Sequence, residues 1–322
     1  SAKASDKADR PLDGCILPNF DPWDKDILPF VELDYDPLKN CHRKFKPLTK
    51  LRKGNLTIDV DDNNDNITCW GRNLPQTVQF LEKAMQAVSF PYLNRIGLNS
   101  RPNGVAMWFG KRMERVDRSL FGLPSLEVDW TYESFCYRYL DNETTLFKEF
   151  SNKGYKTLLA EDWMKGTLNW PDCWGFRNQP TDHYMRPFQV ALEKNASKVL
   201  ENTYSPANCI EQHRDVLRYL QDFIHSYKDH PKFGWIWLSL LSHSRESGTI
   251  HADSDFQRFL LDNKEKIART KLGNLEENNP MFLMTVPKSL REGTDILSIL
   301  RENAARLQTP YDIRATFLDI IK

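Results

Sequence analysis

The feature that most constrains the fold is a repeated succession of a helix-like segment and a short, continuously apolar segment. Residues 145–150 lead through Gly154 into the apolar segment 155–160. A helix face at 216–224 is followed in the same way by the apolar segment 233–240. Continuous apolar runs of this length are typical of strands that are buried on both faces. The chain therefore predicts an α/β fold in which helices cover both faces of a mostly parallel sheet.

Further elements are expected on either side of these two units. Apolar residues recur near helical spacing over 75–85, where Pro75 suits the first turn of a helix. A third strand of the sheet is expected over 281–286, and two helices close the chain, over 296–307 and 313–321.

The first part of the chain has a different composition. Residues 1–70 are rich in Pro, Asp, Asn and Lys, have only short apolar patches and contain Cys15 and Cys41. We therefore expect an irregular, cysteine-containing N-terminal segment over 1–70 and one α/β domain over 71–322.

Charge and hydropathy exclude two classes of partner. Lys plus Arg and Asp plus Glu are equal, at 44 each, so the chain has no net positive field that would favour nucleic acid. No run approaches the roughly 18 apolar residues that a membrane-spanning helix needs. We therefore expect neither a nucleic-acid partner nor a membrane span.

Cysteines and glycosylation sequons favour a secreted, extracellular protein. The six cysteines contain no Cys-x-x-Cys pair of the kind that holds zinc, and their even number permits three disulfides whose pairing the sequence leaves open. Four Asn-x-Ser/Thr sequons are present, at Asn55, Asn66, Asn142 and Asn195. The chain is therefore expected to be a disulfide-bonded glycoprotein.

A candidate nucleophile lies at the start of a short apolar helix. Ser100 comes just before Pro102 and the apolar residues that end at Met107. The free N–H groups of a helix start attract anions such as phosphate or sulfate. Ser100 is thus either a nucleophile beside such an anion or an ordinary helix cap.

Polar residues follow the expected strands, where sites of parallel sheets form. Glu161 and Asp162 follow the first strand, and either bind a metal or cap the next helix. After the second strand come His243, His251, Asp253 and Asp255, whose nitrogen and oxygen atoms suit zinc or manganese. The alternative for these four is solvation or capping.

Six ordered blocks carry a family resemblance over nearly the whole chain. They span 15–30, 99–103, 154–163, 180–187, 237–243 and 275–280, and the block 180–187 reads Pro-Thr-Asp-His-Tyr-Met-Arg-Pro. Together they resemble the uncharacterised animal family called domain of unknown function 229, a branch of the alkaline phosphatase and sulfatase superfamily.

This resemblance implies a fold and a set of site residues. The fold would be alkaline phosphatase/sulfatase-like, and the substrate a phosphate or sulfate ester. Ser100, where the family usually has threonine, would be the nucleophile, and His243 would lie near the substrate oxygens. Asn103, His183 and Arg186 would contact substrate; the Arg186 fork suits an oxyanion, although an ion pair with Asp182 is the alternative.

Two blocks of the family pattern are missing from the chain. An Ile-Asp-Ser strand with the first metal ligand should precede the helix at 75, and an Asp-His-Gly block should lie between 259 and 269. Core strands and metal ligands would be lost with them, so the resemblance implies a weak or inactive ester hydrolase. Two alternatives stay open. One is a non-catalytic binding protein of an extracellular or mineralised matrix, and the other is an active hydrolase with zinc, manganese or calcium whose sequence is incomplete here.

Overall fold

A computed structural model describes residues 73–194, 198–204, 210–243, 246–267 and 282–322. The expected N-terminal segment 1–70 lies outside these residues. So do Cys15, Cys41, Cys69 and Cys209 and the sequon residues Asn55, Asn66 and Asn195.

The described chain is a mixed α/β structure. Its strands are β1 (Val88–Ser89), β2 (Lys156–Glu161), β3 (His183–Tyr184), β4 (Lys232–Trp237) and β5 (Leu283–Met284). Its helices are α2 (Pro75–Gln79), η2 (Phe80–Ala84), α3 (Ser100–Phe109), η3 (Ser119–Phe121), α4 (Tyr132–Cys136), α5 (Leu146–Asn152), α6 (Gly166–Asn169), α7 (Arg186–Glu193), α8 (Lys198–Thr203), α9 (Gln212–Ser226), α10 (Ser239–Ser242), η5 (Glu246–Ala252), α11 (Asp253–Ile267), α12 (Lys288–Gly293), α13 (Ile296–Ala304) and α14 (Pro310–Ile320).

The central sheet has three parallel strands in the order β3, β2, β4. Its middle strand, β2, is buried along five of its six residues. The unit that begins at 145 is confirmed: the Thr145 hydroxyl accepts the N–H of Lys148 at 3.0 Å to start α5, and Gly154, at φ +80°, turns the chain into β2. Glycine adopts this left-handed conformation without the steric cost that a side chain would add.

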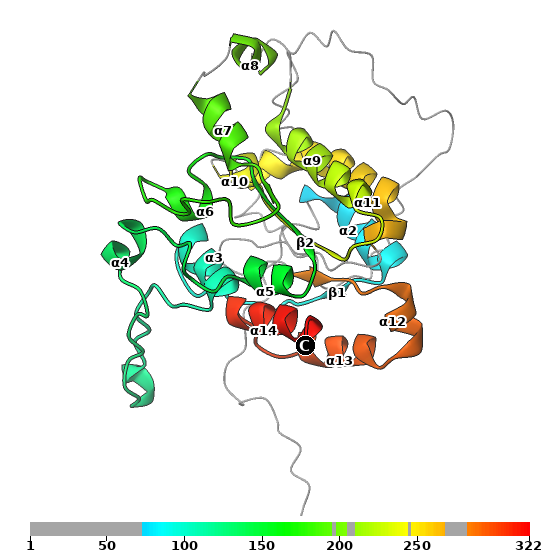
Figure 1. Cartoon of the computed structure of the whole chain (residues 1–322). Helices are drawn as coiled ribbons and strands as arrows, with labels where there is room; N and C mark the ends of the chain where they lie inside the picture. Colours follow the sequence, from blue (N-terminus) through cyan, green and yellow to red (C-terminus); the bar gives the residue numbers. More distant parts are fainter. Residues whose placement is uncertain (1–72, 195–197, 205–209, 244–245, 268–281) are drawn as a thin grey trace, which may run out of the picture.

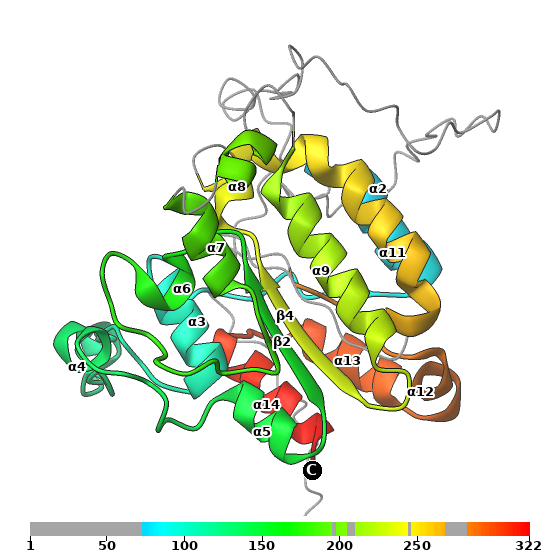
Figure 2. The same ribbon diagram turned by 45° about the horizontal axis from the view of Figure 1, so that its top comes forward.

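Helices cover both faces of this sheet, as expected (Figures 1 and 2). On one face, α3, α5 and α14 pack with a cluster that includes Trp108, Phe147 and Phe150. On the other, α9, α11 and the start of the described chain pack with a cluster that includes Leu220 and Leu260. The strands β2 and β4 run between these two layers (Figure 2). In the chain, α6 follows the C-terminal end of β2, and α10 follows that of β4.

Two expected strands differ from the structure. The segment expected over 281–286 is a strand only at β5, which pairs antiparallel with β1 in a separate two-stranded sheet. Its apolar run correctly indicated burial, but burial does not specify which strand will be the partner. The strand expected over 233–240 ends at Trp237, because residues 239–242 wind into α10.

One disulfide among the described residues joins two segments of the layer on the α3 side of the sheet. Cys136, the last residue of α4, is bonded to Cys173, 37 positions further along the chain. Both cysteines are buried. This bond closes a long loop that contains α5, β2 and α6.

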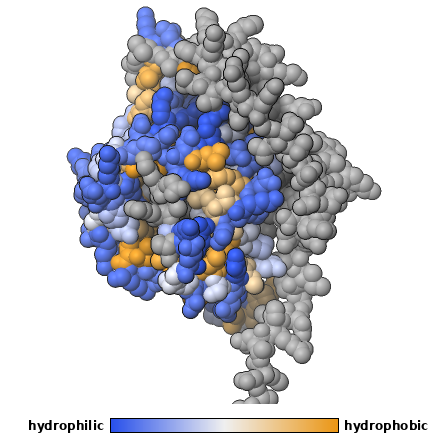
Figure 3. Space-filling model, turned by 90° about the vertical axis from the view of Figure 1, so that its right-hand side faces the viewer, coloured by the Kyte–Doolittle hydropathy of each residue, from blue (hydrophilic) through white to orange (hydrophobic). Residues whose placement is uncertain are grey.

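The surface is mainly hydrophilic on the face drawn in Figure 3, where separate hydrophobic patches interrupt it. Among the described helices, none has both the length and the apolar character needed to cross a membrane.

Candidate functional site

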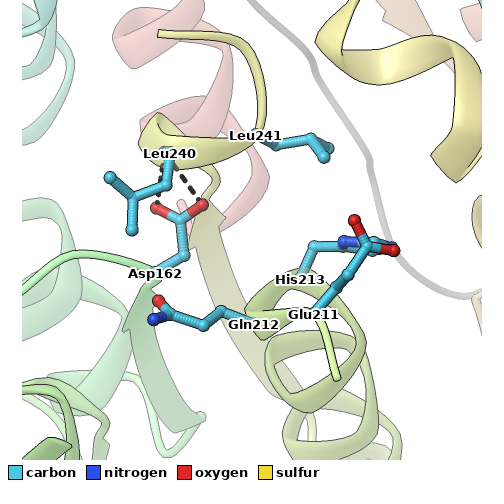
Figure 4. Close-up of a pocket in the computed structure, with 6 residues that line it drawn as sticks. All are labelled: Asp162, Glu211, Gln212, His213, Leu240 and Leu241. Carbon is cyan, nitrogen blue, oxygen red and sulfur yellow. Dashed lines mark hydrogen bonds between the residues drawn. The ribbon is translucent and has the colours of Figure 1, made fainter. Parts of the chain in front are cut away.

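The site begins with two adjacent carboxylates at the C-terminal end of β2. Glu161 accepts the N–H of Thr167 at 2.7 Å, at the start of α6. At the start of α10, Asp162 accepts the N–H of Ser239 at 2.7 Å. It also accepts the N–H of Leu240, at 3.0 Å (Figure 4). The prediction that the acidic pair caps the next helix is confirmed for Glu161, which accepts an N–H at the start of α6. Asp162 instead accepts N–H groups at the start of α10, a helix much further along the chain.

Burial controls the protonation of both carboxyl groups. It raises the pKa of Asp162 from 3.8 to about 7, and the negative charge of Glu161 adds to this effect, while the N–H groups of α10 oppose it. Burial also raises the pKa of Glu161, against the hydrogen bond from Thr167 and the positive charge of Arg186. Asp162 is therefore a carboxyl group that can gain or lose a proton near neutral pH.

Asp162 opens onto a pocket of about 170 Å³. The pocket is lined by Asp162, Glu211, Gln212, His213, Leu240 and Leu241 (Figure 4). The first of these comes from the end of β2, the next three from the start of α9, and the last two from α10. A pocket beyond the C-terminal ends of parallel strands is where ligands bind in α/β sheets.

Beside this pocket lies a group of residues that could hold a metal ion. Glu211, His213 and His251 each offer a ligand atom, and these atoms lie within 4.8 Å of one another. Glu211 immediately precedes α9, His213 lies in its first turn, and His251 belongs to η5. His251 Nε2 lies 2.5 Å from Glu211 Oε1.

The structure does not bring together the four metal ligands predicted from the sequence, His243, His251, Asp253 and Asp255. His251 is in the metal-ligand group, and Asp255 contacts a member of it, with its Oδ2 3.1 Å from His213 Nε2. The carboxylate of Asp253 instead accepts the N–H groups of two residues of α2, Gln76 and Thr77. His243 is exposed, and its ring centroid lies 6.1 Å from that of Trp163.

Ser100 is the first residue of α3 and is exposed. The interpretation of Ser100 as the helix cap is wrong, because the cap is Asn99, whose side chain accepts the N–H of Arg101 at 3.1 Å. The side-chain amide of Asn103 donates to the carbonyl groups of Gly97 and Asn99 and accepts an N–H of the same loop. Asn103 thus holds the loop that leads to Ser100.

The block 180–187 places its polar residues in structural contacts. His183 Nε2 lies 2.7 Å from the hydroxyl of Tyr227. The Arg186 guanidinium donates to the carbonyl of Met164 at 3.0 Å. The suggested pair between Arg186 and Asp182 is not formed, because the Asp182 carboxylate instead binds Thr157 and Lys156 at the other end of β2.

Comparison with known proteins gives the family of this chain. Residues 67–322 match the family described as "Protein of unknown function (DUF229)". The chain belongs to the DUF229 family. No curated protein and no solved structure matches it. The DUF229 match includes every described residue, and therefore the pocket and the metal-ligand group.

Two functional candidates of this DUF229 chain were missed by the sequence reasoning, Glu211 and His213. Their local signal is a Glu-x-His spacing just before an amphipathic helix, which brings both side chains to one helix start. Their third partner, His251, lies 40 positions beyond Glu211. No periodicity connects residues so far apart, so only the tertiary structure reveals the group: α11 packs against α9, and η5, which leads into α11, brings His251 to His213.

Gly166 of the DUF229 chain keeps α6 close to the buried carboxylate of Glu161. Its φ is +43°, and a Cβ added here would lie 2.6 Å from Glu161 Oε2. We expect Gly166→Ala to lower the free energy of unfolding by about 2–3 kcal/mol, from backbone strain and overlap together. Denaturant unfolding measures this loss.

Gly154→Ala is the matched control, because Gly154 also has a positive φ, +80°, but has nothing within 4 Å of the added Cβ. It should cost less than Gly166→Ala. Equal losses at the two positions would contradict the close contact with Glu161.

Proposed function

We propose that this chain is a secreted protein of the sulfatase/phosphatase-like lineage that hydrolyses phosphate or sulfate esters weakly or not at all in this form. Its role would be to bind a component of the extracellular matrix. The observation that carries the proposal is the use of Glu161 and Asp162 as caps of α6 and α10.

Carboxylates that accept backbone N–H groups in this way are not free to coordinate the metals that ester hydrolysis in this lineage needs. Two-metal ester hydrolysis needs ionised carboxylates that coordinate the metals beside the nucleophile. Both oxygens of Asp162 accept backbone N–H groups, and burial raises the pKa of both carboxyl groups. An exposed serine hydroxyl without metal activation is a weak nucleophile.

Two features support a secreted location. The Cys136–Cys173 disulfide is of the kind that persists in oxidising compartments. The sequon residue Asn142 is exposed in a turn, where a glycan can be attached without disturbing the core. Both features lie in the part of the chain that the structure describes.

A second candidate function is metal-dependent hydrolysis in the pocket of Figure 4. It is favoured by one observation: Asp162, with its pKa raised to about 7, shares that pocket with Glu211 and His213. A carboxyl group of this pKa beside a metal ion could move a proton near neutral pH.

Ester hydrolysis by the Ser100→Ala variant tests the two candidates. We expect nitrophenyl phosphate and nitrophenyl sulfate to be hydrolysed at the background rate by the unaltered chain, with zinc, manganese or calcium supplied, and Ser100→Ala to change nothing. Release of nitrophenol measures the rate. Hydrolysis that is lost in Ser100→Ala would overturn the proposal, and hydrolysis that is lost only in Asp162→Asn would favour the second candidate.

A further inference from the structure

We propose that Glu211, His213 and His251 form a binding site for one zinc ion. This inference is independent of whether the chain hydrolyses esters. Two imidazoles and one carboxylate are a ligand set that zinc favours, and three protein ligands leave one position for water or another ligand. Since Glu211 and His213 also line the pocket, a metal held by them would border it.

The ligands come from two elements that already pack together. Glu211 and His213 are positioned by the start of α9, and His251 by the end of η5, just before α11. The rings of His213 and His251 lie 5.9 Å apart between centroids. Both histidine side chains are mostly buried, with 2% of His213 and 11% of His251 exposed. The site is thus built from ordered side chains inside the helix layer.

Asp255 gives His213 the partner that metal-binding histidines usually have. Its Oδ2 lies 3.1 Å from His213 Nε2, and since a carboxylate can only accept, this nitrogen carries the hydrogen and donates it to the bond. The lone pair of the neutral ring is then on Nδ1, where it is available to a metal. A carboxylate behind a histidine ligand holds its tautomer and orientation and raises its basicity.

The charge of the cluster is compatible with a divalent cation. The guanidinium of Arg214 lies beside both carboxylates: its Nε donates to Asp255 Oδ2 at 2.8 Å, and its Nη2 is 3.9 Å from Glu211 Oε2. Histidines that bind a metal are neutral, so these two carboxylates and one guanidinium would leave one net negative charge for the metal.

One oxygen atom of Glu211 lacks a hydrogen bond. This atom, Oε2, is buried and makes no hydrogen bond with the described residues, and Arg214 approaches it only to 3.9 Å. Such an atom calls for an explanation, and a bound ion is one. Two ligand atoms of a tetrahedral zinc site are about 3.3 Å apart, from bonds of about 2.0–2.1 Å. Metal entry would therefore release the proton between His251 Nε2 and Glu211 to solvent, while a proton on Nδ1 keeps the ring neutral. It would also widen their 2.5 Å contact by somewhat less than 1 Å.

Zinc titration of the full chain tests the site. After removal of metals with a chelator, we expect calorimetry with zinc chloride to show one site with a dissociation constant in the micromolar range or below. Glu211→Gln and His251→Gln should each weaken binding by at least about 100-fold, because even loss of a partner behind a ligand costs roughly 10- to 100-fold. Circular dichroism would confirm that each variant is folded.

His225→Gln is the matched control. His225 lies on the same helix, α9, and also pairs with α11, through Asn263 at 3.0 Å, but it is outside the group. This variant should bind zinc like the unaltered chain. If it loses as much affinity as Glu211→Gln, or if the unaltered chain binds no zinc, the proposal is wrong.

A second measurement needs no variant. Diethyl pyrocarbonate modifies accessible imidazoles, and peptide mapping locates them. His213 is too buried to report on this reaction, so the test uses His251, which is 11% exposed, and the exposed His225. Zinc should slow the modification of His251 and leave His225 as reactive as before, and equal modification of His251 with and without zinc would contradict the proposal.

Discussion

The Asp162→Asn variant is expected to lack about 4 kcal/mol of the change in unfolding free energy that Asp162 causes in the unaltered chain as the pH varies. Burial raises the pKa of Asp162 from 3.8 to about 7, so the folded chain binds this proton more tightly than the unfolded chain does. The resulting stabilisation is complete below about pH 4 and is lost as the pH rises through about 7. Since a tenfold change in proton affinity corresponds to about 1.4 kcal/mol, the two pKa values give the expected size.

Asparagine suits this test because it has the shape of aspartate and keeps one oxygen for the N–H groups of α10. Urea unfolding of both proteins at a series of pH values measures the difference in unfolding free energy. The unaltered chain should lose stability relative to the variant as the pH rises. Profiles that stay parallel over the whole range would contradict the buried, protonated state of Asp162.

Asp182→Asn is the matched control with the opposite sign. Burial disfavours ionisation of Asp182, but hydrogen bonds from Thr157 and Lys156 and the charge of Lys156 outweigh it and lower its pKa. Ionised Asp182 therefore stabilises the folded chain at pH values above the ordinary carboxyl pKa, and this stabilisation is lost as the pH falls. The unfolding free energy of the unaltered chain, relative to that of Asp182→Asn, should rise with pH. Relative to that of Asp162→Asn, it should fall with pH.

Removing the Cys136–Cys173 disulfide is expected to cost about 4 kcal/mol of unfolding free energy. The bond joins residues 37 positions apart, and in the chain-entropy account a closed loop of this length restricts the unfolded chain strongly. Alanine is the better replacement, because Cys136 and Cys173 are buried, at 0% and 5% exposure, where a serine hydroxyl would need a partner. Denaturant unfolding of the double alanine variant measures the loss.

The single variants show whether the bond itself is responsible. If it is, Cys136→Ala and Cys173→Ala alone should each lose nearly as much stability as the double variant, since either change removes the same bond. Losses that simply add up in the double variant would indicate two independent packing defects and no disulfide.

Local signals predicted much of the fold around the site. Thr145 and Gly154 delimit α5 and point the chain into β2, and the apolar run after Gly154 is buried in the centre of the sheet. The same signals placed Glu161 and Asp162 at the edge where sites form. They failed for 281–286, because an apolar run indicates burial but carries no information about the strand that will pair with it.

The sequence by itself determined α5, β2, α9 and β4 of the central unit, the position of the acidic pair at the end of β2 and the resemblance to the DUF229 family, which the family match bears out. These depend on neighbours within a few positions, where capping, turn geometry and periodicity act. Only the tertiary structure decided that Asp162 caps α10, that Cys136 pairs with Cys173 and that His251 meets Glu211 and His213. Each of these contacts joins residues 37 to 77 positions apart, and it forms because burying the two helix layers against the sheet brings them together.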